Sequence, residues 1–304
     1  MSVILAYIVV SCTVTRPVVK VAIVAPFTGI YREIGYQVLN GARIAVKEHN
    51  NNNSNVPSLE LIAFDDAGDP TRAVEQAHKI LTDEKVIAVI GHWLDQTTAA
   101  AAPVYMNANI PLVATSASPS NPNNAGVTFF RLHPTVTQIS TEIERLSKTY
   151  RIHSVCNCGL YEAAEFLEAL NNNNSYTTAV GGPLWSLQAF HNITGIRSEG
   201  SFFIVPAPQP MLENESAPYL IQYQIEYPYG PDPTWLSLHA YESINIIANA
   251  IETTKVSTSK SVAISLSRID YHGLIGRVQF DSFGQWIEPQ IRLYKWNNAT
   301  ISLP

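Results

Sequence analysis

Val18–Ala25 (VVKVAIVA), followed by Pro26, Thr28 and Gly29, is the stretch that indicates the fold of this chain. Apart from Lys20 the run is apolar and rich in β-branched residues, which is typical of a strand buried on both faces of a parallel sheet. Pro26 and Gly29 predict a turn where the strand ends. In an α/β fold a helix should follow that turn.

Strand and helix patterns alternate through the first third of the chain. Asp69 is placed to cap a helix whose first position is Pro70, and the Asn tract 50–53 ends the helix before it. Such alternation is typical of a doubly wound parallel sheet. The predicted elements are strands at 18–25, 59–64, 86–90 and 110–114 and helices at 35–49, 69–81 and 97–106.

A second α/β series begins after Pro134 and predicts a second lobe. Two more helices and two terminal strands follow it. The elements expected in this part are helices at 137–150, 162–170, 184–193, 234–254 and 262–269 and strands at 154–157, 176–180, 201–205, 273–280 and 291–296.

The first residues, 1–17, suggest a leader that resembles a signal or lipoprotein sequence. The apolar residues 3–10 lead to Ser11-Cys12, and a small residue directly before a cysteine resembles a bacterial lipoprotein cleavage site. Cys12 is then the predicted lipidation site. Against this, the segment lacks the positive charge that opens a signal peptide, and its apolar run is short for the roughly 7 to 15 residues expected. An extension of the first strand is the alternative.

Composition narrows the function classes. A net charge of −6 with only 19 Lys and Arg argues against a nucleic-acid surface, because phosphate binding requires clustered cations. After the first dozen residues no apolar run reaches the roughly 18 to 20 residues that cross a bilayer, so a soluble body is expected. Cys156 and Cys158 should share one face of a strand, where core packing is expected. Without nearby Cys or His they make a poor zinc site, and we expect no metal or cofactor.

Gly91–Thr98 (GHWLDQTT) is the strongest candidate for a ligand site. The segment joins a strand to the N-terminus of a helix, where strand ends and free N–H groups of an open α/β sheet meet ligands. Residues 114–118 offer hydroxyl and N–H donors at the neighbouring strand end. The alternative makes Asp95 a helix cap and Trp93 a residue of the interface between lobes.

Motifs of common enzyme classes are not found. The sequence has no GxSxG, P-loop, HExxH or strand-following GxGxxG, and its eight histidines are scattered. Asp65-Asp66 at a strand end could form an acid pair or a Mg²⁺ site, but a turn leading to the helix capped by Asp69 is the simpler interpretation. His92 is likewise expected to be a hydrogen-bonded structural residue. We therefore expect a protein without enzymatic activity.

Several motifs resemble the type I periplasmic binding proteins, in particular the leucine/isoleucine/valine-binding branch of the substrate-binding proteins of ABC transporters. They follow one another in the order and spacing of that family over about 18–296. The motifs are VAIVAPFTG (21–29), NGARIA (40–45), FDDAGDPTRA (64–73), VIGH (89–92), IPLV (110–113) and GRVQFD (276–281), with Gly284 after the last.

The resemblance implies two Rossmann-like lobes joined by three hinge segments, with a ligand trapped between them by hinge closure. The expected lobes are 18–131 with 235–270, and 132–234 with 271–304. The predicted ligand-binding residues are Tyr31, Trp93, Asp95, Gln96, Ser116, Ser118, Tyr161 and Trp185.

Three departures from the family pattern bear on the ligand. Asp95 stands where the family has a short hydroxyl, so a ligand carboxylate should be repelled there. The second-lobe acid that pairs with an α-ammonium group would fall near Leu184 and Trp185, where no carboxylate stands. About one βαβ unit of the second lobe is also expected to be missing, because residues 134–137 run almost directly into a helix.

These inferences lead to one main hypothesis and two alternatives. The main one is an extracytoplasmic, monomeric solute-binding protein that delivers a small polar ligand (an amino acid, an amide or a related compound) to the permease of an ABC transporter. It would act in the periplasm or at the outer face of the cytoplasmic membrane, with a lipid anchor if Cys12 is modified. The first alternative is the ligand-binding module of a sensor or receptor, which would require a transmembrane segment and a cytoplasmic domain, and we expect neither from this sequence. The second, an enzyme on a Rossmann-like fold, would require a catalytic constellation that the sequence does not offer.

Overall fold

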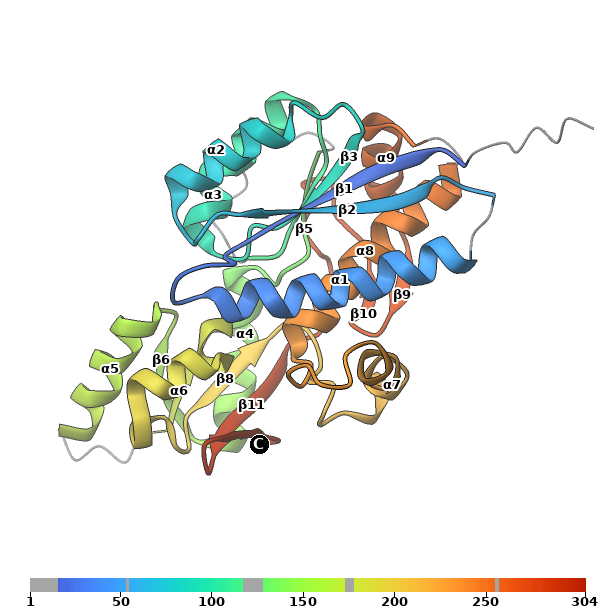
Figure 1. Cartoon of the computed structure of the whole chain (residues 1–304). Coiled ribbons are helices and arrows are strands. Elements are labelled where there is room, and N and C mark those ends of the chain that lie inside the picture. Colours follow the sequence, from blue (N-terminus) through green and yellow to red (C-terminus); the bar gives the residue numbers. More distant parts are fainter. Residues whose placement is uncertain (1–15, 53–54, 117–127, 173–177, 255–256) are drawn as a thin grey trace, which may run out of the picture.

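The computed structural model describes residues 16–52, 55–116, 128–172, 178–254 and 257–304. These residues form two lobes, each built on its own five-stranded sheet (Figure 1). The predicted two-lobed α/β fold is confirmed. Cys12 and Ser118 lie outside the described residues.

The first sheet has the strand order β2-β1-β3-β4-β5, and all of its strands are parallel. Strand β1 is the run VVKVAIVA, and its residues from Val21 to Ala25 are fully buried, as the β-branched pattern predicts. Helix α2 begins at Pro70, and Asp69 caps it by accepting a hydrogen bond from the Arg72 N–H (2.8 Å). The elements are β1 (Val18–Ala25), α1 (Arg32–Asn52), β2 (Ser58–Asp65), α2 (Pro70–Ile80), β3 (Val86–Ile90), α3 (Asp95–Asn107), β4 (Leu112–Ala114) and β5 (Phe129–Arg131).

Helices cover both faces of the first sheet. Val21 and Ile23 of β1 pack with α1, α8 (Trp235–Thr254) and α9 (Ser259–Leu266), while Ala22 and Val24 pack with α2 and α3. Helices α1 and α8 approach so closely that a Cβ atom on Gly41 would lie 1.8 Å from the Ser237 carbonyl oxygen. The helix near Trp235 therefore belongs to the first lobe, in agreement with the sequence prediction.

The second sheet has the order β12-β11-β8-β7-β6. In the described chain its parallel part has three strands, and β11 runs antiparallel to both β8 and β12. A capping box between Thr135 and Gln138 starts helix α4. The elements are α4 (Val136–Tyr150), β6 (Ile152–Cys156), α5 (Leu160–Asn172), β7 (Thr178–Gly181), η2 (Pro183–Ser186), α6 (Gln188–Thr194), η3 (Gly195–Ser198), β8 (Phe202–Val205), β11 (Arg292–Asn297) and β12 (Thr300–Ser302).

The described chain passes between the lobes at 132–135, 206–216 and 279–291. The third passage begins after a hairpin, β9 (Tyr271–Gly273) and β10 (Gly276–Val278), which occupies most of the predicted strand 273–280. The chain turns at Gly276, where φ is +96°. Tyr271 donates a hydrogen bond to the Glu242 carboxylate of α8 (2.7 Å), so the hairpin packs with the first lobe rather than the second.

Helix α7 (Ala217–Glu226), which follows η4 (Asn214–Ser216), is not among the predicted elements. Its buried residues Tyr219 and Tyr223 pack with Ile44 of α1 and Leu238 of α8. The expected boundary of the second lobe at residue 234 therefore moves back to 206–216, because α7 lies against the first lobe (Figure 1).

Cys156 and Cys158 form a disulfide, with their Cα atoms 5.3 Å apart. The expectation that the two cysteines share one face of a strand is wrong, because β6 ends at Cys156 and Cys158 lies in the following loop, although both side chains do pack against the core. Disulfides persist mainly in oxidising, extracytoplasmic compartments.

None of the helices in the described ranges combines the length and hydropathy that a transmembrane span requires.

Candidate functional site

A cavity of about 420 Å³ lies between the two lobes. Its first-lobe wall comes from the start of α1, the β3–α3 loop and the end of β4, and its second-lobe wall comes from the loops after β6 and β7. The start of α8 and the first passage between the lobes close its base. The lining residues are Tyr31, Ile34, Trp93, Leu94, Asp95, Gln96, Thr115, Ser116, His133, Asn157, Cys158, Gly159, Glu162, Gly182, Pro183, Leu184, Leu187, Trp235 and Leu236.

The β3–α3 loop is held tightly against β1. Gly91 has a φ of +123°, and a Cβ atom there would lie 2.2 Å from the Val24 carbonyl oxygen. Only glycine fits such a position without displacing backbone. This close approach places Trp93, Asp95 and Gln96 at the cavity.

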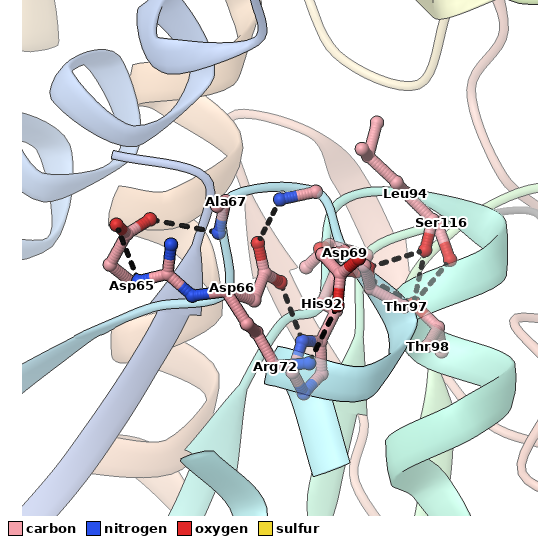
Figure 2. A network of polar contacts seen from close by, with 12 residues as sticks. Asp65, Asp66, Ala67, Asp69, Arg72, His92, Leu94, Thr97, Thr98 and Ser116 are labelled. Carbon is pink, nitrogen blue, oxygen red and sulfur yellow. Dashed lines mark hydrogen bonds and ion pairs between the residues drawn. The ribbon is translucent and has the colours of Figure 1, made fainter. Parts of the chain in front are cut away.

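A buried network of polar contacts also holds the β3–α3 loop in place (Figure 2). His92 Nδ1 donates to the Asp66 carboxylate (2.6 Å), and both side chains are fully buried. The other oxygen of Asp66 accepts the Gly68 N–H (2.9 Å), and His92 Nε2 lies 3.3 Å from the Tyr105 hydroxyl. Burial and the nearby Asp66 charge raise the pKa of Tyr105. The interpretation of His92 as a structural residue agrees with these contacts.

The Asp65 carboxylate stabilises the turn before α1 and does not form an acid pair with Asp66. Its carboxylate accepts hydrogen bonds from the N–H of Phe27, the hydroxyl of Thr28 and the N–H of Ala67 (2.8, 2.8 and 2.9 Å). Burial alone raises the pKa of Asp65, but these hydrogen bonds outweigh it and hold the pKa below its ordinary value. All of these partners belong to the protein's own turns, which agrees with the simpler interpretation of Asp65-Asp66.

Hydroxyl groups join the two strand-end loops of the first lobe. Thr98 Oγ1 lies 2.8 Å from Ser116 Oγ and donates to the carbonyl oxygens of His92 and Leu94 at 3.0 and 2.9 Å (Figure 2). Thr115 Oγ1 also donates to the His92 carbonyl (3.1 Å). The neighbouring loops thus form one connected wall, as the strand-end argument predicts.

The structure brings five of the predicted ligand residues together at the cavity: Tyr31, Trp93, Asp95, Gln96 and Ser116. Two others lie elsewhere. Trp185 is fully buried and stacks on Phe190 at 4.8 Å between ring centroids, so it is a core residue of the second lobe. Tyr161 is 64% exposed and is not part of the cavity lining.

Sequence reasoning missed several lining residues, of which Glu162 matters most for charge. It lies in the first turn of α5, after the end of β6, so the strand-end rule applied to the first lobe would have found it in the second. Its carboxylate extends over Gly159, where a Cβ atom would meet Glu162 Oε2 at 2.5 Å. The second lobe therefore does supply an acid to the cavity, at a position other than Leu184 or Trp185.

The charged side chains in the described cavity lining are Asp95 and Glu162, and neither Lys nor Arg is among the lining residues. Arg131 lies behind this wall. Burial lowers its pKa, and the carboxylates of Asp95 and Asp281 oppose that shift. The Asp95 charge is thus partly balanced from within the protein, whereas Glu162 faces the cavity from the other lobe.

Two buried histidines lie at the base of the cavity. Burial lowers the pKa of His133 to about 4 and that of His239 to about 3. The Arg131 charge lowers the pKa of His133 further, and His133 lowers that of His239. His239 Nε2 donates to the Leu132 carbonyl (2.8 Å), and its ring meets those of Trp93 and Trp235 edge-on. At neutral pH the base is therefore uncharged and aromatic.

Comparison with known proteins gives the fold and the first lobe a clear context. A sequence profile described as periplasmic binding protein matches residues 18–164. The amino acid binding protein of Pseudomonas aeruginosa is 32% identical over 105 residues, which are 34% of this chain and 28% of that protein. The leucine-specific-binding protein of Salmonella typhimurium is 35% identical over 101 residues, 33% of this chain and 27% of that protein. The matched part thus spans less than a third of either relative.

Whereas the sequence matches cover mainly the first lobe, the structural similarity to solved binding proteins covers both lobes. The crystal structure of a leucine binding protein from Thermotoga maritima aligns with 94% of this chain and 97% of its own, with a TM-score of 0.76 at 17% identity. The resemblance to the type I periplasmic binding proteins is confirmed in fold and in sequence motifs. The relatives compared are binding proteins.

Proposed function

From the type I periplasmic-binding-protein fold and the match of residues 18–164 to that family, we propose that this chain is an extracytoplasmic solute-binding protein without enzymatic activity. It captures a small polar ligand between its lobes by hinge closure and delivers it to the permease of an ABC transporter. We expect it to act as a monomer. The Cys156–Cys158 disulfide supports an oxidising compartment.

The observation that carries this proposal is the cavity between the lobes. Side chains of both lobes line it, so a molecule held there would contact both walls and favour the closed arrangement. Its volume of about 420 Å³ suits a small metabolite and lies within the usual range for ligand pockets.

The charge of the lining favours a ligand that carries an amino group. Glu162 can accept hydrogen bonds from an ammonium group, and the indole groups of Trp93 and Trp235 are part of the same lining, where a cation or an apolar side chain can pack. An amino acid, an amide or a related amine meets these requirements. Ser116 and the first turn of α3 remain available for a carbonyl oxygen.

Anchoring of the protein to the membrane through a lipid on Cys12 is a separate part of the proposal, and it rests on the sequence pattern Val10-Ser11-Cys12. Mass spectrometry of protein purified from the membrane fraction of a bacterial host tests it. A diacylglyceryl adduct on Cys12 supports the anchor, and an unmodified Cys12 contradicts it.

A thermal-shift screen tests the binding function. The panel contains leucine, glutamine, agmatine, putrescine, benzylamine and benzoate, each at millimolar concentration. A compound present at 100 times its dissociation constant stabilises the folded protein by about 2.7 kcal/mol, which raises the melting temperature by several degrees. We expect the amino compounds to produce the largest shift and benzoate the smallest. Absence of any shift across amines, amides and amino acids would contradict the proposal.

A further inference from the structure

The first turn of α1 reaches from the first lobe to the second. The carboxylate of Glu33 accepts a hydrogen bond from the backbone N–H of Gln188 (2.9 Å), the first residue of α6. The two residues are 155 positions apart in the chain and belong to different lobes. The contact requires the two lobes to lie as close together as they do in this structure, an arrangement called closed below.

Helix α6 lacks a cap from its own lobe. Its N-cap residue Leu187 offers no side-chain hydrogen bond, so the first N–H groups of the helix require an acceptor from elsewhere. Burial raises the pKa of Glu33, while the N–H groups of Gln188 and Ala189 act in the opposite direction. Glu33 therefore serves as the missing cap from across the lobe boundary.

Tyr31, at the start of the same turn, lies near α5, a different helix of the second lobe. Its ring lines the cavity and is half-buried. Burial raises the pKa of its hydroxyl, the Glu162 charge acts in the same direction, and a backbone hydrogen bond at Leu160 lowers it. The turn thus contacts the beginnings of both α5 and α6.

The turn itself is held firmly on the first lobe. Asp65 binds the preceding Phe27 and Thr28, and the Ile34 N–H donates to the Tyr31 carbonyl (2.9 Å). A Cβ atom on Gly35 would lie 2.5 Å from the Pro26 carbonyl oxygen, so α1 starts directly against the end of β1. Because the turn is fixed on the first lobe, the hydrogen bond from Gln188 to Glu33 restricts the position of the second lobe and not that of the turn.

We propose that residues 31–33 form a closure latch, in which Glu33 caps α6 from the opposite lobe and stabilises the closed arrangement independently of the ligand. Glu33 is a positioning residue, because it does not line the cavity. This inference rests on the proposed function only in assuming that the lobes open and close. Loss of the latch should shift the closed-to-open ratio toward the open form by about tenfold, the scale of one partly buried hydrogen bond to a charged group.

The test uses ligand-free protein, so that it stays informative even if no solute is found to bind. Small-angle X-ray scattering gives the radius of gyration, and hydrogen exchange gives the protection of the Gln188 and Ala189 amides. The variants are Glu33→Ala, the conservative Glu33→Gln, whose amide oxygen can still accept, and the control Glu75→Ala on the exposed side of α2.

Glu33→Ala should have a larger radius of gyration than the wild type and faster exchange at both amides. Glu33→Gln should be close to the wild type in both the radius of gyration and the exchange rates, and Glu75→Ala should match the wild type. A local structural role of Glu33 would change exchange at α6 without changing the radius of gyration, and that result would overturn the latch. Equal scattering and equal exchange in Glu33→Ala and wild type would overturn it as well.

Discussion

The two lobes build their walls of the cavity in different ways. The first lobe has five parallel strands, and its wall is held by Gly91 against β1 and by the Asp66–His92 pair beneath the loop. The second lobe has three parallel strands in the described chain and an antiparallel hairpin, and its wall comes from loops after β6 and β7. The difference teaches that the first lobe is a fixed frame, while the second supplies the acid Glu162 and, at α6, the contact with Glu33.

The largest effect is expected at Gly91. Gly91→Ala introduces a Cβ atom 2.2 Å from the Val24 carbonyl oxygen at a φ of +123°, so backbone must move. Strain and overpacking together should lower the free energy of unfolding by about 4 kcal/mol. Urea denaturation of the variant and the wild type measures this difference in the free energy of unfolding.

Gly200→Ala is the matched second-lobe control for this substitution. Gly200 also has a positive φ (+76°), but a Cβ atom there would meet nothing within 4 Å. Only the backbone strain of about 1 kcal/mol should remain. If the two variants were equally stable, the first-lobe wall would not be the rigid frame described above.

The buried histidine His133 predicts a loss of stability in acid. Its folded-state pKa of about 4 lies below the unfolded value near 6.5, so the unfolded chain binds a proton first as the pH falls. The His133 contribution to stability is complete above about pH 6.5 and should decline by about 3 kcal/mol as the pH approaches 4. Among the neighbouring groups, Arg131 lowers the pKa of His133 and the hydrogen bond to the Pro134 carbonyl raises it. The adjacent His239 also has a lowered pKa and titrates in the same acid range.

Urea denaturation between pH 7 and pH 4 measures this decline. His133→Gln should show a shallower decline than the wild type. The control His272→Gln should not differ from the wild type, because that side chain is 70% exposed. An unchanged slope in His133→Gln would assign the acid sensitivity to another group.

A smaller effect than that of His133 is expected from the second-lobe disulfide. Cys156 and Cys158 enclose a very short loop, so the bond removes little entropy from the unfolded chain, about 1.5 kcal/mol. Addition of a reductant should lower the melting temperature slightly. The double variant Cys156→Ser/Cys158→Ser should melt like the reduced wild type and should not respond to the reductant; a response there would point to Cys12.

Local patterns were sufficient to predict most of the fold. Strand β3 has the predicted bounds 86–90, and Asp69 and Pro70 start α2 as expected, because strand burial and helix capping depend on neighbouring residues. Helix α7 was missed because its buried residues, Tyr219 and Tyr223, are stabilised by distant partners on α1 and α8.

The same distinction explains the predictions about the site. Trp93, Asp95 and Ser116 follow from their positions at strand ends, which the order of elements already gives. Trp185 also follows a strand, but its contacts with Phe190 and Trp296 place it in the core. The disulfide could not be inferred from spacing, because it depends on where β6 ends.

The central claim is that the cavity between the lobes binds a small amine-bearing solute with Glu162 as its acceptor. Isothermal titration calorimetry tests it most directly, with the amino compound that gives the largest thermal shift titrated into the wild type and into Glu162→Gln. We expect the wild type to bind one equivalent and Glu162→Gln to bind at least tenfold more weakly, with an unchanged melting temperature in the absence of the compound. Equal affinity of the two proteins for that compound would contradict the claim.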